Sequence, residues 1–450
     1  MALENPVLLK RIPTAPWGDP KDRHYVDFDE YTRTGGYEAL RGILETEPKD
    51  IVNRVKEAEV RGRGGAGFSC GLKWSFLPPP DGGTRYLAVN ADESEPGTFK
   101  DRLLMDYDPH LLLEGIAIAC HATQSDTAYI YIRGEYHYEA HMIEQALKEA
   151  YANNIFGEQS ILGKVNDRTL NCYVHRGAGA YICGEETGLL ESLEGKRGWP
   201  RIKPPFPAVK GLFGRPTVIN NVETLACLPD VLINGTEWWK SMGRPSHFGD
   251  AAPGSYGPKL FGMSGHLAKP GVYEEHLGIK LSELIENHCG GMRNGKKFKA
   301  AIAGGLSTGV LGPDEYDAEM DFDIGKRFGI LGLGTAGAVV MDEDTDMVMV
   351  ARNSLRFYSH ESCGQCTPCR EGTGWLYQML CRIEEGNGRF KDLDLLDEIA
   401  ASMGAMPGTT ICGLADGANW SLRTILKKFR GEFEARCKAS LVQVGVKVGQ

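Results

Sequence analysis

Strand-like and helix-like patterns alternate along the first 240 residues. Short apolar runs predict buried strands at 86–89, 128–132, 171–174 and 217–219. Amphipathic patterns predict helices at 50–60, 109–122, 138–152, 184–194 and 222–234. Strands that alternate with helices are typical of a parallel sheet, so residues 1–240 are predicted to form an α/β domain.

Polar side chains follow two of these strands at the point where each strand ends. Val89 leads into Asn90, Asp92 and Glu93, and the last strand leads into Asn220 and Asn221. Ligands of open α/β sheets bind beyond the carboxyl ends of the strands. The sequence therefore predicts a binding site at this edge of the sheet.

The pattern changes twice after residue 240. A segment rich in Gly, Pro and Ser at 241–257 is predicted to be a linker. A strand, a turn, a second strand, a helix and a returning strand follow, which predicts a small β-grasp-like α+β domain over 241–335. From residue 346 a short strand is expected, followed by helices at 352–361, 369–386, 392–403 and 417–437. Residues 336–450 are therefore predicted to form a helical bundle.

Composition and charge argue against some classes of function and favour others. The chain has 450 residues and a formal net charge of −10, which does not favour a nucleic-acid partner. No apolar run is long enough to cross a bilayer, so direct membrane insertion is not expected. The N-terminal residues lack the apolar core of a secretory signal, and the chain is expected to be cytoplasmic. Its 12 cysteines then favour metal binding over disulfides.

Three of these cysteines form the tight motif C-x2-C-x2-C. Cys363, Cys366 and Cys369 lie within seven residues of one another, and Gly364 allows the loop to turn sharply. Three thiolates at this spacing are typical ligands of a cubane iron–sulfur cluster. Zinc remains an alternative because His360 is nearby, although zinc sites more often use paired C-x2-C units.

The fourth ligand has three candidates downstream. Cys381 lies inside a helical pattern and is expected to pack against its neighbours. Cys437 lies on a basic, exposed helical segment. Cys412 follows the irregular segment Pro407–Ile411, from which a thiol can reach outward. We favour Cys412.

A glycine-rich segment lies between the first predicted helix and the first strand. Gly62, Gly64 and Gly67 have the spacing of a dinucleotide-binding fingerprint. That fingerprint follows a strand in a Rossmann fold, whereas here it follows a helix, which argues against a Rossmann dehydrogenase. A flexible turn is the simplest interpretation. The functional alternative is a loop against which a flat or phosphorylated ligand lies.

Charged and aromatic residues near this loop are suitable for such a ligand. Arg63 and Lys73 are available to a phosphate. Phe68, Trp74 and Phe76 are available to stack on rings, although aromatic residues at this spacing are more often part of a core.

A second set of candidates lies between residues 177 and 207. Glu185 and Glu186 begin a predicted helix, where carboxylates favour the helix dipole. The same carboxylates are suited to bind ribose hydroxyls and to repel a 2′-phosphate. Lys203 and Phe206 lie in a stiff, basic, proline-rich loop that would otherwise be a solvated surface loop.

Together these motifs resemble the NADH-binding flavoprotein subunit of respiratory complex I. The matching segments occur in the order of that family and span essentially the whole chain: RGRGGAGF (61–68), KWSF (73–76), NADESEPGT (90–98), GAGAYICGEET (177–187), KPPFP (203–207), NNVET (220–224) and SCGQCTPCREG (362–372). The resemblance implies an FMN-binding α/β domain, a ubiquitin-like β-grasp (SLBB) domain and a helical bundle that holds one [4Fe–4S] cluster.

The resemblance also implies the ligand residues. FMN is expected to contact the Gly-rich loop and the strand ends: Gly62, Arg63, Gly64, Gly65, Ala66, Gly67, Lys73, Asn90, Asp92, Glu93, Gly184, Glu185, Asn220, Asn221 and Thr224. NADH is expected to contact the carboxylates, the lysine and the rings next to FMN: Glu95, Glu186, Lys203, Phe68, Phe76 and Phe206. The implied cluster ligands are Cys363, Cys366, Cys369 and Cys412.

The activity implied is that of the electron-input subunit of a proton-translocating NADH:quinone oxidoreductase. NADH passes hydride to FMN, and the cluster accepts single electrons; Glu95 and Glu186 are the implied catalytic-site residues. The implied partners are a thioredoxin-like [2Fe–2S] subunit and a large multi-cluster iron–sulfur subunit, on the cytoplasmic side of the inner membrane.

The alternative is the diaphorase subunit of an NAD-linked hydrogenase or formate dehydrogenase. Such relatives often carry extra iron–sulfur domains that this sequence lacks, so the first interpretation is favoured. A zinc-stabilised binding module without redox activity is the alternative from another class.

Overall fold

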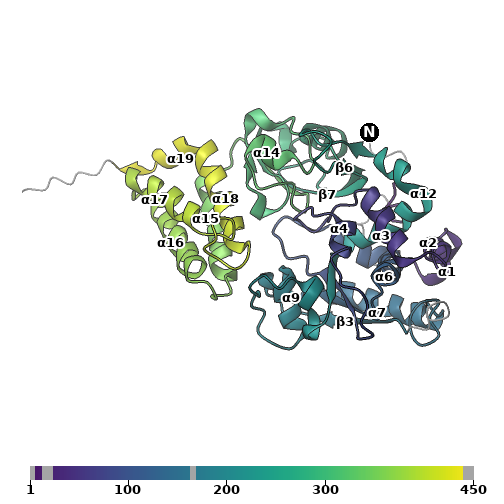
Figure 1. Cartoon of the computed structure of the whole chain (residues 1–450). Helices are drawn as coiled ribbons and strands as arrows, with labels where there is room; N and C mark the ends of the chain where they lie inside the picture. Colours follow the sequence, from purple (N-terminus) through teal and green to yellow (C-terminus); the bar gives the residue numbers. More distant parts are fainter. Residues whose placement is uncertain (1–5, 13–23, 163–168, 439–450) are drawn as a thin grey trace, which may run out of the picture. The chain divides into compact units, whose positions relative to one another are not determined.

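The computed structural model describes residues 6–12, 24–162 and 169–438. The chain divides into two compact units, the first ending at Glu343 and the second beginning at Asp344. Figure 1 shows the elements of each unit, coloured along the sequence. No described helix is long and apolar enough to cross a membrane.

The first unit contains the predicted parallel sheet. Its strands are β1 (Tyr86–Ala91), β2 (Thr127–Ile132), β3 (Asn171–Arg176) and β4 (Thr217–Asn221). They lie in the order β3-β2-β1-β4, and every pairing is parallel. All four predicted strands are therefore confirmed.

Helices cover this sheet largely where the sequence predicts them. They include α3 (Pro48–Glu57), α6 (Pro109–Thr123), α7 (His137–Ala152) and α9 (Glu186–Leu193). The predicted helix 222–234 is instead two helices, α11 (Val222–Ala226) and α12 (Leu228–Lys240), which meet at Cys227. The short helices α1 (Phe28–Arg33), α2 (Glu38–Gly42) and α5 (Asp101–Tyr107) have no counterpart among the predictions.

Helix α6 is the centre of this core. All of its residues are buried, from Pro109 to Thr123, and most of them are apolar. It packs closely on α11, because a Cβ added at Gly115 would lie 2.1 Å from the carbonyl oxygen of Leu225. Glycine at this position lets the two backbones approach each other.

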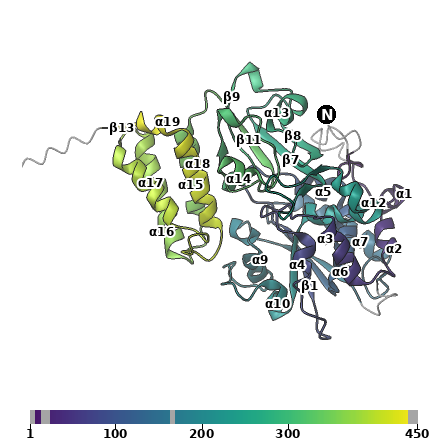
Figure 2. The same ribbon diagram turned by 45° about the horizontal axis from the view of Figure 1, so that its top comes forward.

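The second sheet of the first unit has the order β10-β9-β11-β7-β8, in which β10 is the short strand Val310–Leu311. Its main strands are β7 (Pro258–Gly265), β8 (Gly271–His276), β9 (Phe298–Ile302) and β11 (Gly337–Asp342). Strands β7 and β8 form an antiparallel hairpin, and β11 lies parallel to β7 between it and β9. Figure 2 shows these strands beside the short helix α13 (Leu281–Glu283).

This arrangement agrees with the predicted β-grasp type and corrects one boundary. The prediction ended the domain at residue 335, but β11 lies in the middle of the sheet and extends to Asp342. The predicted boundary assigned the residues of this strand to the helical bundle instead of to the sheet that they complete. The helix predicted between the second strand and the returning strand is α13, which continues as the single turn Leu284–His288.

The second unit is a helical bundle. Its helices are α15 (Met347–Glu361), α16 (Thr367–Glu384), α17 (Phe390–Ser402), α18 (Leu414–Lys428) and α19 (Arg430–Glu434). The short strand expected after residue 346 is wrong, because Asp346 caps α15 directly by accepting the N–H groups of Val348 and Met349. The apolar run at 347–350 is the first turn of that helix.

The close contact of α6 with α11 gives a testable prediction. Gly115→Ala should lower the free energy of unfolding by about 1–3 kcal/mol, because the new methyl group collides with a backbone carbonyl that has little room to move. The matched control is Gly42→Ala, at the last residue of α2, where an added Cβ meets nothing within 4 Å. That variant should be more stable by up to about 1 kcal/mol. Denaturant unfolding of the full chain measures both, and equal effects would contradict the assignment.

Candidate functional site

The strand order locates the candidate site. From β1 the chain moves to β2 and β3 on one side, whereas β4 pairs with the other side of β1. The strand order therefore reverses between β1 and β4, and such a reversal opens a crevice at the carboxyl ends of the strands. Asn90 lies beside Asn221 at these ends. The predicted polar residues are thus neighbours.

The Gly-rich loop closes on itself next to this crevice. Gly62 donates its N–H to the carbonyl of Phe68 at 2.8 Å, and Cys70 donates to Val60 at 2.8 Å. The guanidinium of Arg61 spans the loop and donates to the carbonyl of Gly67 at 2.7 Å. Gly65 has a φ of 136°, which a residue with a side chain rarely adopts.

The loop fits against the end of β4 only because it lacks side chains. A Cβ at Gly64 would lie 2.9 Å from the Cβ of Asn221, yet Gly64 is exposed on its other side. The N–H of Arg63 donates to the hydroxyl of Thr224 at 2.8 Å, which fixes the loop to α11. A bare backbone surface beside polar strand ends is suitable for a flat, phosphorylated ligand such as FMN.

The two predicted cations have partners within the protein. Arg63 is fully buried and donates to the carbonyl of Tyr256 at 2.8 Å. Lys73 donates to the carbonyl of Ile219. The expected contact of the Arg63 guanidinium with a phosphate is therefore not supported, because the group points into the core. The ammonium of Lys73 lies beside β4, and Lys73 remains a predicted ligand.

The side chains of Asn220 and Glu93 also form hydrogen bonds within the protein. The amide of Asn220 accepts from the indole of Trp74 at 2.9 Å and is buried. The Glu93 carboxylate accepts N–H groups at the start of α5, from Lys100 at 2.9 Å and Asp101 at 2.7 Å. Burial, reinforced by the nearby Asp101, raises the pKa of Glu93 to about 7. These two side chains shape the crevice, and Asn221 and Asn90 are its more accessible amides.

Glu185, Glu186 and Lys203 meet at the start of α9. Glu185 caps the helix, accepting the N–H groups of Thr187 at 2.8 Å and Gly188 at 3.0 Å. The ammonium of Lys203 donates to Glu185 at 2.9 Å and to Glu186 at 2.6 Å. The two carboxylates raise the pKa of Lys203 against the opposing effect of burial. This ion pair links the 203–207 loop to the helix.

Three of the predicted aromatic rings are exposed. Phe68, Phe76 and Phe206 are 47%, 53% and 57% exposed. The centroids of the Phe68 and Phe76 rings are 6.2 Å apart. Trp74, by contrast, is buried and belongs to the core, as aromatic residues at this spacing more often do. The exposed rings are available to stack on a ligand.

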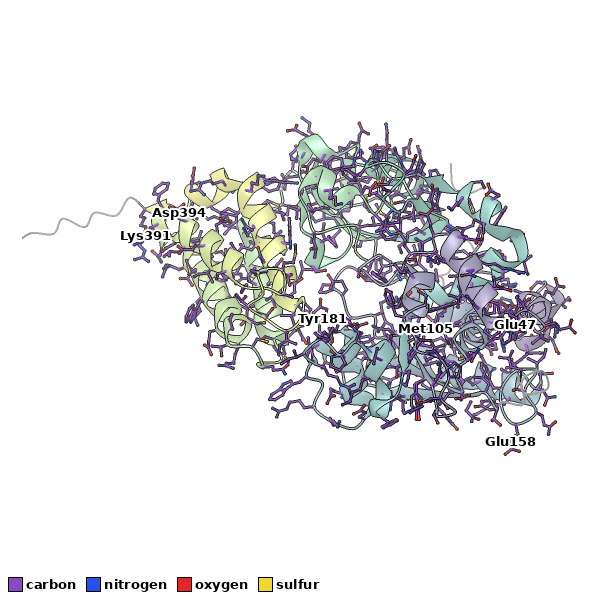
Figure 3. All side chains as sticks on the ribbon, in the orientation of Figure 1. Glu47, Met105, Glu158, Tyr181, Lys391 and Asp394 are labelled. Carbon is purple, nitrogen blue, oxygen red and sulfur yellow. The ribbon has the colours of Figure 1, made fainter. Side chains whose placement is uncertain are left out.

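Two residues that hold Glu95 were not predicted from the sequence. The hydroxyl of Tyr181 donates to Glu95 Oε2 at 2.6 Å, and the N–H of Ser307 donates to Oε1 at 2.7 Å. Burial raises the pKa of Glu95. Tyr181, which Figure 3 labels, lies within the motif 177–187, which is the only signal that could have indicated it. Ser307 belongs to the β-grasp domain, and its surroundings in the sequence carry no signal for this contact.

In the second unit, the three clustered cysteines surround the start of α16. Cys366 is the N-cap of this helix and Cys369 lies in its first turn. The Ser362 hydroxyl lies 3.3 Å from Cys369 Sγ, and the N–H of Ile411 donates to Cys366 Sγ at 3.3 Å. A helix N-terminus favours the negative charge of a thiolate-bound cluster.

Zinc is the alternative to an iron–sulfur cluster at these cysteines. Zn–S bonds of about 2.3 Å in a tetrahedron require sulfur atoms about 3.8 Å apart. Among the described residues, no three cysteine sulfur atoms lie within 4.8 Å of one another. His360 is exposed and lies near Glu361.

The three candidates for the fourth ligand are now separated in space. Cys381 lies twelve residues after Cys369 on α16, about 18 Å along the helix axis. Cys437 lies near Gly388, beyond the other end of α16. Cys412 directly follows Ile411, whose N–H reaches Cys366. Cys412 therefore stays the predicted fourth ligand.

Comparisons with known proteins agree with both sites. Residues 55–230 match the Nuo51 FMN-binding domain, 260–311 match the SLBB domain, and 349–436 match the NADH-ubiquinone oxidoreductase-F iron-sulfur binding region. An F subunit of the NADH-quinone oxidoreductase of Rhizobium meliloti (strain 1021) is 50% identical over 96% of this chain and 97% of its own length. The corresponding protein of Rickettsia conorii (strain ATCC VR-613 / Malish 7) is 47% identical over 92% of this chain and 96% of its own length.

The chain belongs to the family of NADH-quinone oxidoreductase F subunits. The predicted family is thus confirmed, as are FMN, NADH and the [4Fe–4S] cluster as its cofactors. Among solved structures, the chain is similar to an NAD+-reducing [NiFe]-hydrogenase in its H2-reduced state, with a TM-score of 0.78 and 34% identity. That match covers 91% of this chain and 66% of the hydrogenase chain.

The position of Cys412 generates a testable prediction. Cys412→Ala should lose most of the iron and the broad absorbance of the cluster, because three thiolates leave one iron without its protein ligand. Cys381→Ala is the matched control on the same unit and should keep both. Iron analysis and electron paramagnetic resonance of the reduced proteins measure the difference. A full cluster in the Cys412 variant would show that another group is the fourth ligand.

Proposed function

We propose that this chain is the NADH-oxidising, electron-input subunit of a respiratory NADH:quinone oxidoreductase. The observation that carries the proposal is that one chain of this family combines an FMN-binding domain with an iron–sulfur region. When bound, FMN accepts hydride from NADH and releases electrons singly to the cluster. The chain's own residues bind, orient and shield the reactants.

The FMN-binding role is assigned to the crevice between β1 and β4. The Gly-rich loop presents bare backbone, and Asn90 and Asn221 present amide groups at the strand ends. Reduction adds negative charge to the flavin, which fixed amide and backbone donors stabilise without reorganisation. Gly184, whose carbonyl accepts from Asn90 at 2.8 Å, brings the start of α9 to the same place.

The NADH-binding role is assigned to the surface next to this crevice. Phe68, Phe76 and Phe206 offer exposed rings to the adenine and nicotinamide groups. Glu186 and Lys203 offer charges at the start of α9, and Glu95 is held in place from the β-grasp domain. These residues would hold the nicotinamide next to bound FMN, and such positioning would supply much of the catalysis.

The assembly is also a proposal. Relatives named as subunits of NADH-quinone oxidoreductase support a membrane-bound complex in which this chain is peripheral, on the cytoplasmic side of the inner membrane. We expect a thioredoxin-like [2Fe–2S] subunit and a large multi-cluster iron–sulfur subunit as its neighbours. Identification of the proteins that purify with this chain from its source tests these partners.

The diaphorase subunit of an NAD+-reducing hydrogenase is the second candidate. The structural similarity to such a hydrogenase favours it. Its identity to this chain is 34%, against 50% for the quinone oxidoreductase subunit. The first assignment is therefore preferred.

The proposed reaction makes a spectroscopic prediction. The purified chain should be yellow-brown, and anaerobic NADH should bleach its flavin absorbance, because hydride transfer reduces the isoalloxazine ring. NAD+ at the same concentration is the control and should leave the spectrum unchanged. A flavin spectrum that NADH does not alter, in protein with bound FMN, would contradict the proposal.

The carboxylate of Glu186 makes a second prediction, about the choice of nucleotide. Glu186→Gln should raise kcat/KM for NADPH relative to NADH by about tenfold, because it removes a charge that repels the 2′-phosphate. The matched control is Glu191→Gln on the same helix, where the carboxylate pairs with Arg201. It should leave the ratio unchanged. An unaltered ratio in the Glu186 variant would show that this carboxylate does not face the 2′ position.

A further inference from the structure

Four charged side chains form a completely buried cluster beneath the crevice. Lys100 and Asp101 lie at the start of α5, Glu223 lies on α11, and Lys259 lies on β7 of the β-grasp domain. Their exposed fractions are 1%, 3%, 0% and 0%. None of the four is used in the binding roles assigned above.

Short contacts join the four groups. The ammonium of Lys100 lies 2.7 Å from Asp101 and 2.8 Å from Glu223. The ammonium of Lys259 lies 2.6 Å from Glu223, whose second oxygen accepts the N–H of Leu260 at 2.9 Å. Glu223 is therefore shared between the two domains of the first unit.

The cluster is one hydrogen bond from the crevice. The amide of Asn221 donates to Asp101 Oδ2 at 2.6 Å, and the N–H of Glu223 donates to Oδ1 at 3.3 Å. Asn221 is also the residue against which Gly64 packs. Movement in the cluster would thus be transmitted to the residues that shape the crevice.

Stability alone gives little reason for such a cluster. Burying ions costs several kcal/mol each, and well-packed apolar residues are often as stable in their place. The surrounding charges are balanced: Arg63 and Glu93 also act on these groups, and both are buried. Burial lowers the pKa of Lys259 to about 7, with Lys100 and Arg63 repelling its charge and Glu223 favouring it.

We propose that the cluster of Lys100, Asp101, Glu223 and Lys259 positions Asn221 and sets the reduction potential of FMN through its fixed charges. The inference rests on the proposed function, because it requires FMN in the crevice. Hydride transfer adds one negative charge to the flavin, so each buried charge below it changes the relative affinity for the oxidised and reduced forms. The four residues are positioning residues and do not touch the reactants.

The test uses the opposite charges of two neighbouring residues, Lys259 and Glu223. Lys259→Met removes a positive charge and should lower the ratio of affinities for reduced and oxidised FMN. Glu223→Gln removes a negative charge and should raise that ratio. We expect changes on the order of tenfold, as for one unit charge at about 10 Å in a medium of dielectric about 20. A tenfold change shifts a two-electron potential by about 30 mV.

The measurement is a dye-equilibrated reductive titration of the full chain with bound FMN, at about pH 6, where Lys259 is protonated. The matched control is Lys10→Met, which breaks an ion pair with Asp230 at 2.8 Å in the same unit. It should keep the wild-type potential. The double variant Glu223→Gln/Lys259→Met loses both charges and should return close to the wild-type potential.

The outcomes separate the inference from the proposed function. Wild-type protein that does not bind FMN would overturn the proposed function itself. Two results would overturn the inference alone: unchanged potentials in the FMN-bound variants, or potential shifts of the same sign in both single variants. A general loss of packing does not depend on the sign of the charge removed, so it does not predict shifts of opposite sign. If a single variant does not fold, Lys259→Arg and the double variant decide, since both preserve the net charge. A shift in either would overturn the proposal.

Discussion

The parallel pairing of β4 with β1 is the constraint on which the first unit depends. It brings Asn90 and Asn221, far apart in the sequence, to the same sheet edge. The Gly-rich loop, α5 and α11 all meet at this edge, through the contacts of Gly64, Asp101 and Thr224. Without that pairing, the polar motifs would be unrelated surface loops.

Much of this fold is visible in the sequence because its signals are local. The four parallel strands are short apolar runs, and the long helices have regular periodicity. Strand β11 was assigned to the wrong domain, because no local pattern shows that it pairs with β7, more than 70 residues earlier in the chain. Helix α5 was missed because it begins with a buried charge, Asp101, whose partner Asn221 lies 120 positions away.

The site was predictable as a set of motifs and less so as a set of contacts. Sequence reasoning identified the Gly-rich loop and the strand-end amides, and the fold brings them together. It did not distinguish side chains that face a ligand from those that are buried and bind to other parts of the protein. Arg63 and Glu93 are of the second kind, and only the burial of their charged groups reveals it. Contacts such as Ser307 with Glu95 join residues 212 positions apart, and no local pattern encodes them.

The segment that carries Cys412 has few contacts of its own to hold it in place. Residues 404–413 contain no helix or strand, and they are held by a few bonds, including those from Ala405 and Met406 to Asp416 and from Ile411 to Cys366. A cluster bound to cysteines on both sides would join this segment to α16 covalently. Metal-binding energy then becomes folding energy for the helical unit. The integrity of that unit would follow the iron supply of the cell, whereas the α/β unit holds its own core.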